Sequence, residues 1–350
     1  MTPHVIKLPA ELVVRRRTPY EGLRVCVTGG AGFIGGHLVD ALQALGATIW
    51  VIDDLSNSDA GHLAGLMELA PDQVNFIHGS ILDDVALRRA MTDAHVVFHL
   101  AALGSVPRSI ADPERSWVVN STGTIRVLEA ARRAKCSRVV LAASSSVYGD
   151  TPTLPKVETM PLMPRSPYAA SKAAAEQACL AWATAYGLDT VSLRYFNVFG
   201  PRQSPDSPYA AVIPLFARQL LKGERPVIFG DGQQSRDFTY VANAVLATLL
   251  AGASEKPLAG EAINVGAGKR TTLLELAALM AELCVEDGRA ITAEPEHRPS
   301  RPGDVLHSLA DISKASSLLG YKPLIGLKQG LADTIAWQRG LPATQKPDIG

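Results

Sequence analysis

The stretch TGGAGFIGG, residues 28–36, decides the fold prediction. It ends an apolar run that is typical of a buried strand, and it opens a run at 32–46 that predicts a helix. Gly29, Gly32 and Gly35 have the spacing of a dinucleotide-binding turn, in which the backbone approaches a pyrophosphate and a helix N-terminus faces it. A side chain at either of the first two glycines would obstruct that approach. The stretch therefore predicts a strand, a phosphate-binding turn and a helix.

The first half of the chain alternates apolar strands with helices. Besides the strand at 23–30, we expect strands at 48–54, 74–80, 95–102 and 137–145 and helices at 84–92 and 112–135. This alternation predicts an α/β fold with a Rossmann-type, doubly wound parallel sheet and helices on both faces. After residue 190 the pattern loosens into a helix at 209–223 and many short elements, which predicts a smaller C-terminal α/β lobe for the substrate. We expect an N-terminal tail at 1–20, a dinucleotide-binding domain at 21–190 with sheet contributions from later segments, a mainly substrate-binding lobe at 191–340 and a tail at 341–350.

The composition excludes several kinds of partner. The chain has 350 residues with 34 basic and 34 acidic side chains, so its net charge of zero offers no footprint for nucleic acid or an anionic membrane. No run is apolar over the ~20 residues that a membrane-spanning helix needs. The N-terminus lacks an apolar signal core, and the four cysteines have no CxxC spacing. We therefore predict a cytoplasmic protein that binds no nucleic acid, no membrane and no metal ion.

Two acidic residues close the second predicted strand. An acid at the position of Asp53 or Asp54 can bind the ribose hydroxyls of an adenosine, and it would repel a 2′-phosphate. No arginine stands nearby in the sequence to accept that phosphate. The strand end therefore predicts NAD rather than NADP as the cofactor.

The run SPYAASK places a tyrosine and a lysine on one helix face, because Tyr168 and Lys172 lie four residues apart. A free tyrosine has a pKa of about 10 and is a poor base near neutral pH, whereas a neighbouring ammonium would favour its phenolate. The run LAASSSVYGD adds serines at the end of the fifth predicted strand, where parallel sheets present ligand sites. The combination predicts an acid/base pair beside a nicotinamide, with a serine hydroxyl holding the substrate oxygen.

Seven motifs point to one family: TGGAGFIG, HLAALGSVPRS, ASSSVYGD, SPYAASK, LRYFNVFGPRQ, GDGQQSRDF and RPGDV. Over residues 22–340 they resemble the extended short-chain dehydrogenase/reductases, and within them the nucleotide-sugar epimerases. HLAALGSVPRSI, AASSSVYGD and LRYFNVFG look most similar to bacterial UDP-N-acetylglucosamine 4-epimerases of surface-polysaccharide pathways. The resemblance implies an NAD-dependent 4-epimerase of UDP-hexoses, which oxidises C4 to a 4-keto intermediate and reduces it from the other face. It also implies tightly bound NAD and a homodimer built from the helices at 112–135 and 167–187.

The resemblance also assigns site residues. Tyr168 would be the base, Lys172 its partner and a ribose ligand, and Ser144, four residues before Tyr148, the hydroxyl that orients the sugar O4. The implied cofactor contacts are Gly29, Gly32, Phe33, Ile34, Asp53, Asp54, Asn57, Ser80, Ile81, Leu100, Ala101, Ala102, Asn120, Tyr168, Lys172 and Tyr195. The implied substrate contacts are Gly104, Ser105, Ser144, Ser145, Tyr168, Asn197, Ala211, Val212, Arg236, Arg301, Asp304 and Ser308. Of these, the two arginines and Asp304 would bind the nucleotide diphosphate and its ribose.

The choice of sugar rests on one small residue. In related epimerases the position of Ser308 walls the sugar pocket, and a bulky residue there would exclude a 2-acetamido group. Serine leaves room, which favours UDP-GlcNAc and UDP-GalNAc without forbidding UDP-Glc and UDP-Gal. Gly104 and Ser105 also resemble the N-acetyl-tolerant branch. The alternative is that Ser308 is simply an exposed strand residue.

Three residues depart from the family pattern. Ser80 stands where the family has an aspartate that binds adenine, which weakens one expected NAD contact. Asp54 replaces a common asparagine, and Gly36 a common serine. None of these changes removes a residue of the acid/base chemistry.

Several related functions remain as alternatives. A 4,6-dehydratase would need an Asp-Glu pair in place of Ser145 and Ser146, and a decarboxylase a glutamate in place of Ser146. A UDP-glucuronate 4-epimerase would need a cation for the sugar carboxylate, for which Arg108 is the candidate. A non-catalytic NAD-binding protein would be expected to lack Tyr168 or Lys172, and both are present.

Overall fold

A seven-stranded parallel sheet forms the centre of the protein. The computed structural model describes residues 17–206, 210–285, 294–300 and 305–340. The strands are β1 (Arg24–Thr28), β2 (Thr48–Asp53), β3 (Val74–His78), β4 (Val96–His99), β5 (Arg138–Ser144), β6 (Asp189–Tyr195) and β11 (Glu261–Val265). Their order across the sheet is β11-β6-β5-β4-β1-β2-β3, and all neighbours are parallel. The strand order changes direction next to β1, which is where such sheets bind nucleotides.

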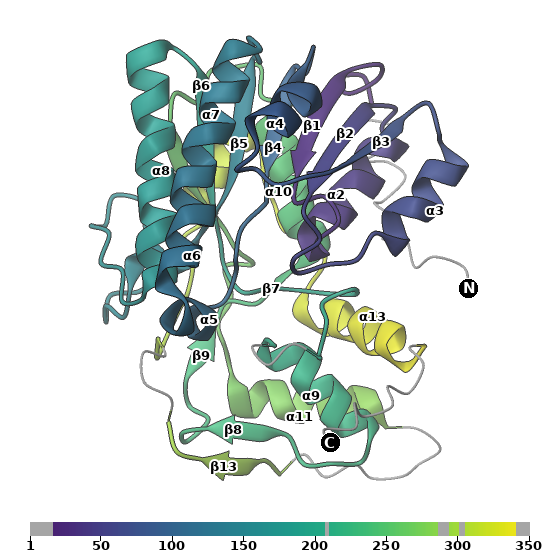
Figure 1. Ribbon diagram of the computed structural model, residues 1–350. Coiled ribbons are helices and arrows are strands. Elements are labelled where there is room, and N and C mark those ends of the chain that lie inside the picture. The colour runs from purple at the N-terminus through teal and green to yellow at the C-terminus, as the bar shows by residue number, and fades with distance from the viewer. Residues whose placement is uncertain (1–16, 207–209, 286–293, 301–304, 341–350) are drawn as a thin grey trace.

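Helices cover both faces of this sheet (Figure 1). One face carries α2 (Phe33–Ala44) and α10 (Val241–Gly252), and the other carries α4 (Asp84–Met91), α7 (Gly123–Arg133) and α8 (Pro167–Tyr186). Successive strand residues point to opposite faces, so Val25 and Val27 join the first core and Cys26 the second. This architecture confirms the predicted doubly wound α/β fold.

The long helix predicted at 112–135 is interrupted. It consists of α6 (Pro113–Trp117), the π-helical turn η1 (Val118–Thr122) and α7, and the short α5 (Val106–Ala111) precedes it. Asp112 separates α5 from α6. Its carboxylate caps the start of α6 by accepting a hydrogen bond from Arg115 N at 3.1 Å. The sequence analysis did not name α10, since a helix that is apolar all round lacks the periodic pattern of a half-exposed one.

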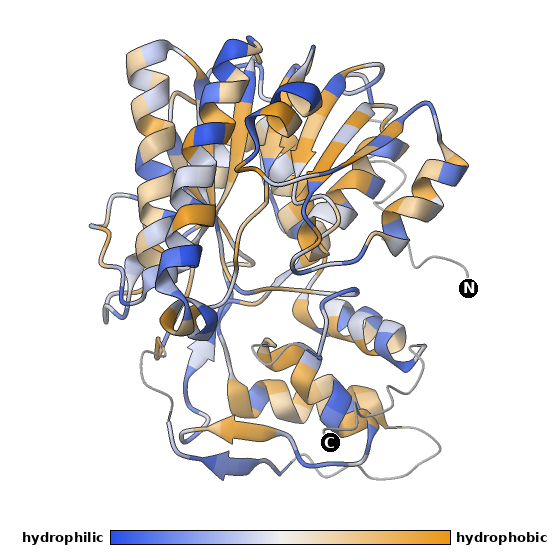
Figure 2. Cartoon of the chain, in the orientation of Figure 1, coloured by the Kyte–Doolittle hydropathy of each residue, from blue (hydrophilic) through white to orange (hydrophobic). Residues whose placement is uncertain are grey.

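A smaller group of elements lies beyond the carboxyl ends of the strands (Figure 1). It contains α9 (Val212–Leu221), α11 (Leu273–Cys284), α13 (Leu327–Arg339) and the strand pair β8 (Val227–Phe229) and β13 (Glu296–Arg298). Two further strand pairs are β7 (Val198–Phe199) with β10 (Thr239–Tyr240), and β9 (Ser235–Arg236) with β12 (Thr271–Thr272). Figure 2 shows apolar β8 beside hydrophilic β13, as expected for a strand pair with an exposed edge. The remaining helices are α3 (Gly61–Leu69) and α12 (Ser313–Leu319).

Within the described ranges, every helix is too short or too polar to cross a bilayer.

Candidate active site

The glycine turn between β1 and α2 is pressed against the end of β4. Gly29 has φ of +73°, and a Cβ atom there would lie 2.5 Å from the backbone nitrogen of Ala101. A Cβ atom on Gly35 would lie 2.0 Å from the carbonyl oxygen of Gly29, so only glycine allows the helix to start this close to the turn. Gly32, the N-cap of α2, lines the adjoining cleft, and no side chain caps this helix, so the N-terminus of α2 adjoins the cleft as it does in pyrophosphate sites.

A narrow cleft runs from this turn to the end of β2. The predicted cofactor residues that line it are Gly29, Gly32, Asp53, Asp54, Asn57, Ile81, Leu100, Ala101 and Ala102. The Asp53 carboxylate accepts from Leu55 N at 2.9 Å and from Ala31 N in the glycine turn at 3.0 Å. Burial raises the pKa of Asp53, and these backbone donors oppose the rise. This aspartate therefore holds the glycine turn against the end of β2.

Ser80 and Asn120, also predicted as cofactor contacts, are not among the residues that line this cleft. The hydroxyl of Ser80 accepts from Leu82 N at 3.2 Å within its own turn, and its side chain does not line the cleft. Asn120 is buried, and its amide group accepts from Leu103 N at 2.8 Å and donates to the hydroxyl of Ser171 at 3.0 Å. The amide therefore ties the strand-end loop to α8, and its role in the structure is to hold the cleft wall rather than to line it.

The predicted acid/base residues come together at the N-terminus of α8. Ser166 caps this helix by accepting from Ala169 N at 3.1 Å, and Pro167 occupies its first turn, where a missing N–H is harmless. Tyr168 lies on the wall of a cavity, and Ser144 reaches the same cavity from the end of β5. Lys172, one turn further on, is buried and donates from Nζ to the carbonyl oxygen of Ala142 in β5 at 2.9 Å.

Burial shifts the pKa values of Lys172 and Tyr168 in opposite directions. Burial lowers the pKa of Lys172 to about 8. Burial raises the pKa of Tyr168, and the interaction that opposes this rise is a hydrogen bond with Ser144 rather than the charge of the lysine. Desolvation of the phenolate therefore dominates the pKa of Tyr168.

The cavity beside Tyr168 has a volume of about 510 Å³. The predicted residues that line it are Phe33, Ile34, Gly104, Ser105, Ser144, Ser145, Tyr168, Tyr195, Asn197, Arg236 and Ser308. Ser308 is only 8% exposed, which rules out the alternative of an exposed strand residue, and its hydroxyl accepts from Asn197 Nδ2 at 3.2 Å. Phe33, Ile34 and Tyr195, which were predicted to contact the cofactor, line this cavity together with Tyr168. We call it the sugar cavity below.

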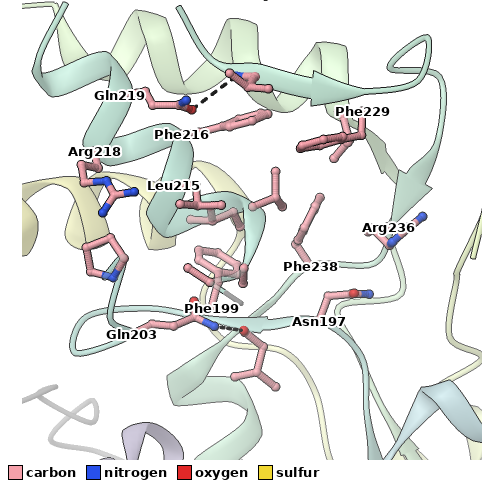
Figure 3. A pocket seen from close by; sticks show the side chains of 18 of the residues that line it. Asn197, Phe199, Gln203, Leu215, Phe216, Arg218, Gln219, Phe229, Arg236 and Phe238 are labelled. Carbon is pink, nitrogen blue, oxygen red and sulfur yellow. Dashed lines mark hydrogen bonds between the residues drawn. The ribbon is translucent and has the colours of Figure 1, made fainter. Parts of the chain in front are cut away.

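A second cavity of about 670 Å³ continues toward α9 and β8 (Figure 3). Asn197, Gln203 and Arg236 line both cavities, so the two share a wall. Of the predicted substrate residues, Ala211 and Val212 line this second cavity alone. Arg301 and Asp304 lie outside the described residues.

The second cavity combines aromatic walls with arginines. Figure 3 shows Phe216, Phe229 and Phe238 between Arg218 and Arg236. Phenyl walls and three arginines, Arg218, Arg236 and Arg298, suit a nucleotide base and a diphosphate. The sequence analysis missed these phenylalanines and Gln203. The only available signal was the presence of Gln203 and Phe238 within the quoted motifs LRYFNVFGPRQ and GDGQQSRDF.

A family model described as the NAD dependent epimerase/dehydratase family matches residues 25–266. The chain belongs to this family. Its cofactor is therefore NAD, which the cleft at the glycine turn fits: the N-cap of α2 lines the cleft, and an acid ends β2. Both the predicted family and the predicted cofactor are confirmed.

Individual relatives cover nearly the whole chain. The UDP-glucose 4-epimerase of Mycolicibacterium smegmatis is 39% identical over 319 residues, which span 91% of this chain and 99% of that protein. The UDP-N-acetylglucosamine 4-epimerase of Methanobrevibacter ruminantium, solved in complex with UDP-N-acetylmuramic acid, is 39% identical with a TM-score of 0.83, covering 91% of this chain and 99% of its own. The UDP-glucuronic acid 4-epimerase of Bacillus cereus, solved with UDP-glucuronic acid and NAD, is 32% identical with a TM-score of 0.83 and the same coverages. NAD-dependent chemistry of the epimerase/dehydratase type on nucleotide sugars is thus the activity of this family member.

Proposed function

We propose that this protein is an NAD-dependent 4-epimerase that interconverts UDP-GlcNAc and UDP-GalNAc, and also UDP-Glc and UDP-Gal. The observation that carries the proposal is the small, buried Ser308 on the wall of the sugar cavity, in the same lining as Tyr168 and Ser144. Relatives whose names include UDP-N-acetylglucosamine and UDP-glucose support both sugar types.

The chain's own residues would move a proton at the sugar O4. NAD held in the cleft at the glycine turn would supply reversible hydride transfer at C4, so the overall reaction would be an isomerisation. Tyr168 would take the proton from the C4 hydroxyl, and Ser144 would hold that oxygen and favour the phenolate through its hydrogen bond. Lys172, anchored on Ala142, would place its ammonium one turn below the tyrosine. The oxidised sugar must turn over before it is reduced, and the sugar cavity lies within the size range of small-ligand sites.

The N-acetyl preference follows from the space around C2. The hydroxyl of Ser308 is held by Asn197, and no bulkier group stands at this wall position. Gly104, which lines the same cavity, is exposed, and a Cβ atom built there would meet nothing within 4 Å. We propose that a 2-acetamido group occupies the space between these two residues.

The alternative of a glucuronate substrate finds less support. Among the described residues of the sugar cavity, the cations are Lys156 and Arg236. The ammonium of Lys156 donates to the carbonyl oxygens of Thr151 at 2.5 Å and Thr153 at 2.9 Å, so it is committed to the backbone of its own loop. Arg108, the candidate from the sequence, donates to Asn57 and is not part of the cavity wall.

A dehydratase is also less well supported. Elimination at C6 needs an acid and a base beyond the tyrosine. Within the described lining of the sugar cavity there is no aspartate or glutamate, and the two positions after Ser144 are serines.

We also propose that the protein is a homodimer. Apolar side chains stand exposed on the adjoining helical segments α6, η1, α7 and α8, namely Trp117, Val118, Ile125 and Leu180. A second copy that packs against these helices would bury them. Light scattering on the purified protein tests this, and a monomer at micromolar concentration would contradict it.

The substrate test uses the purified enzyme without added NAD. UDP-GlcNAc, UDP-Glc and UDP-GlcA are incubated separately, and the C4 epimers are resolved chromatographically. We expect UDP-GlcNAc to be converted to UDP-GalNAc, UDP-Glc to be converted to UDP-Gal, and UDP-GlcA to remain unchanged. No conversion of any sugar would overturn the epimerase proposal, and conversion of UDP-GlcA alone would replace the proposed substrate.

A further inference from the structure

A buried ion pair joins α8 to β6 behind the proposed acid/base residues. Glu176 and Arg194 are each 3% exposed. The guanidinium donates from Nε to one carboxylate oxygen of Glu176 at 2.9 Å and from Nη2 to the other at 2.5 Å. This bidentate geometry fixes the relative orientation of the helix and the strand, because two parallel hydrogen bonds allow little rotation.

The same guanidinium holds a tyrosine. Arg194 donates from Nη1 to the hydroxyl of Tyr148 at 2.6 Å, and its central carbon lies 4.8 Å from the centroid of that ring. The Tyr148 hydroxyl in turn donates to Asn264 Oδ1 at 2.7 Å. Both hydrogen-bonding capacities of this buried hydroxyl are therefore used, and the ring is clamped between β6 and β11.

Tyr148, Glu176 and Arg194 each lie close in the chain to a residue that lines the sugar cavity or to Lys172. Tyr148 ends the single 3₁₀ turn (Ser145–Tyr148, labelled η2) that begins directly after Ser144. Glu176 lies one helical turn beyond Lys172 and two turns beyond Tyr168 on α8. Arg194 precedes Tyr195, and the register of β5 and β6 pairs Tyr195 with Ser144. The group thus connects the helix that carries Tyr168 to the turn that carries Ser144.

The ion pair is a poor source of stability. Removing two charges from water costs several kcal/mol per ion, which their attraction only roughly offsets. What such a pair supplies well is a fixed geometry. We infer that Glu176, Arg194 and Tyr148 form a positioning network that sets Ser144 against Tyr168 for proton transfer. The inference rests on the proposed function only in taking Tyr168 and Ser144 as the acid/base pair.

Loosening the network should raise the pKa of Tyr168. The hydrogen bond from Ser144 opposes the rise in the pKa of Tyr168 that burial causes. If the 3₁₀ turn shifts and this bond is lengthened, the pKa of Tyr168 rises further, because the phenolate loses its donor. The rate then reaches its plateau at higher pH, since the base must be ionised to accept the sugar proton.

The test compares two conservative variants of buried tyrosines. Tyr148→Phe keeps the ring over Arg194 and removes only the clamped hydroxyl. Tyr20→Phe is the matched control, because the Tyr20 hydroxyl is also buried and donates to the carbonyl oxygen of Leu249 in α10 at 2.6 Å, and neither residue lines the cleft or the two cavities. We expect Tyr148→Phe to lower kcat between about 10- and 100-fold with KM within twofold, and to retain NAD. Tyr20→Phe should leave kcat unchanged.

A titration provides a readout that needs no turnover. Ultraviolet difference spectroscopy follows the ionisation of tyrosines in the holoenzyme. The part of the tyrosinate signal that the Tyr168→Phe variant lacks belongs to Tyr168. We expect this titration to move to higher pH in Tyr148→Phe and to stay in place in Tyr20→Phe. Because it needs no sugar, it remains decisive if the proposed epimerase activity fails.

A second design guards against misfolding. Removing one partner of the ion pair strands a buried charge, whereas replacing both partners by apolar residues is often tolerated. The double variant Glu176→Leu/Arg194→Met should fold, lower kcat as Tyr148→Phe does, and show the same shift in the Tyr168 titration. If Tyr148→Phe and the double variant lose thermal stability but keep the wild-type kcat and the wild-type Tyr168 titration, the network is structural only and the inference is overturned.

Discussion

Replacing Gly29 by alanine tests the phosphate-binding turn, and Gly22 supplies a matched control. Both glycines have left-handed backbones, with φ of +73° and +71°. They differ in their surroundings: a Cβ atom on Gly29 would lie 2.5 Å from Ala101 N and 2.8 Å from the carbonyl carbon of Leu100, whereas one on Gly22 would meet nothing within 4 Å. The pair therefore separates backbone strain, which both variants share, from steric overlap, which only one has.

The magnitudes follow from these contacts. A left-handed alanine costs about 1–2 kcal/mol, and this cost applies to both variants. Overlap with a packed backbone adds roughly 1–3 kcal/mol, because Ala101 or the glycine turn must move. We therefore expect Gly22→Ala to lower the free energy of unfolding by about 1–2 kcal/mol and Gly29→Ala by about 2–5 kcal/mol. Movement of the turn would also displace the N-terminus of α2, where the pyrophosphate is expected, so the NAD affinity should fall at least about tenfold, or 1.4 kcal/mol.

Two measurements decide the matter. Urea denaturation of the NAD-free proteins gives the two unfolding free energies, and the NAD released on denaturing the purified proteins gives the cofactor content per chain. Gly22→Ala should retain NAD at the wild-type level, while Gly29→Ala should lose most of it. Equal stability and equal NAD content in the two variants would refute the close approach of the turn to the strand end.

Three further predictions concern the acid/base residues and the sugar cavity. Tyr168→Phe should retain NAD but lower kcat by at least about 10²-fold, because the proton acceptor is lost; near-normal turnover would show that another group is the base. Ser308→Tyr should lower kcat/KM for UDP-GlcNAc by about tenfold or more and spare UDP-Glc, and an equal loss on both sugars would contradict the proposed space for the acetamido group. Burial lowers the pKa of Lys172 to about 8, so above that pH the unfolded chain binds more protons than the folded one. Its contribution to the unfolding free energy should therefore rise between about pH 8 and pH 10, by up to about 1.4 kcal/mol per pH unit, and Lys172→Met should abolish this slope in urea denaturation.

The agreement between sequence and structure is best where a local pattern has one physical meaning. A glycine turn between an apolar strand and a helix has few alternatives, so the parallel sheet and the place of Gly29 and Asp53 could be predicted. Ser144 and Tyr168 could be placed in one cavity because strand ends and helix starts meet at the same edge of such a sheet. The hydrogen bonds of Asn120 to Leu103 and Ser171 could not be predicted, because a buried amide can serve a loop and a helix as readily as a ligand.

The sequence by itself determined the doubly wound sheet, the family and the cofactor, since each depends on residue types at fixed short spacings along the chain. Only the tertiary structure decided that Ser308 is buried against Asn197, that Phe216, Phe229 and Phe238 line the second cavity, and that Arg194 links Glu176 to Tyr148. These contacts join segments that are far apart in the sequence. The pKa of Tyr168 belongs to the same group, because it depends on how much water the folded chain excludes, and no local spacing encodes that.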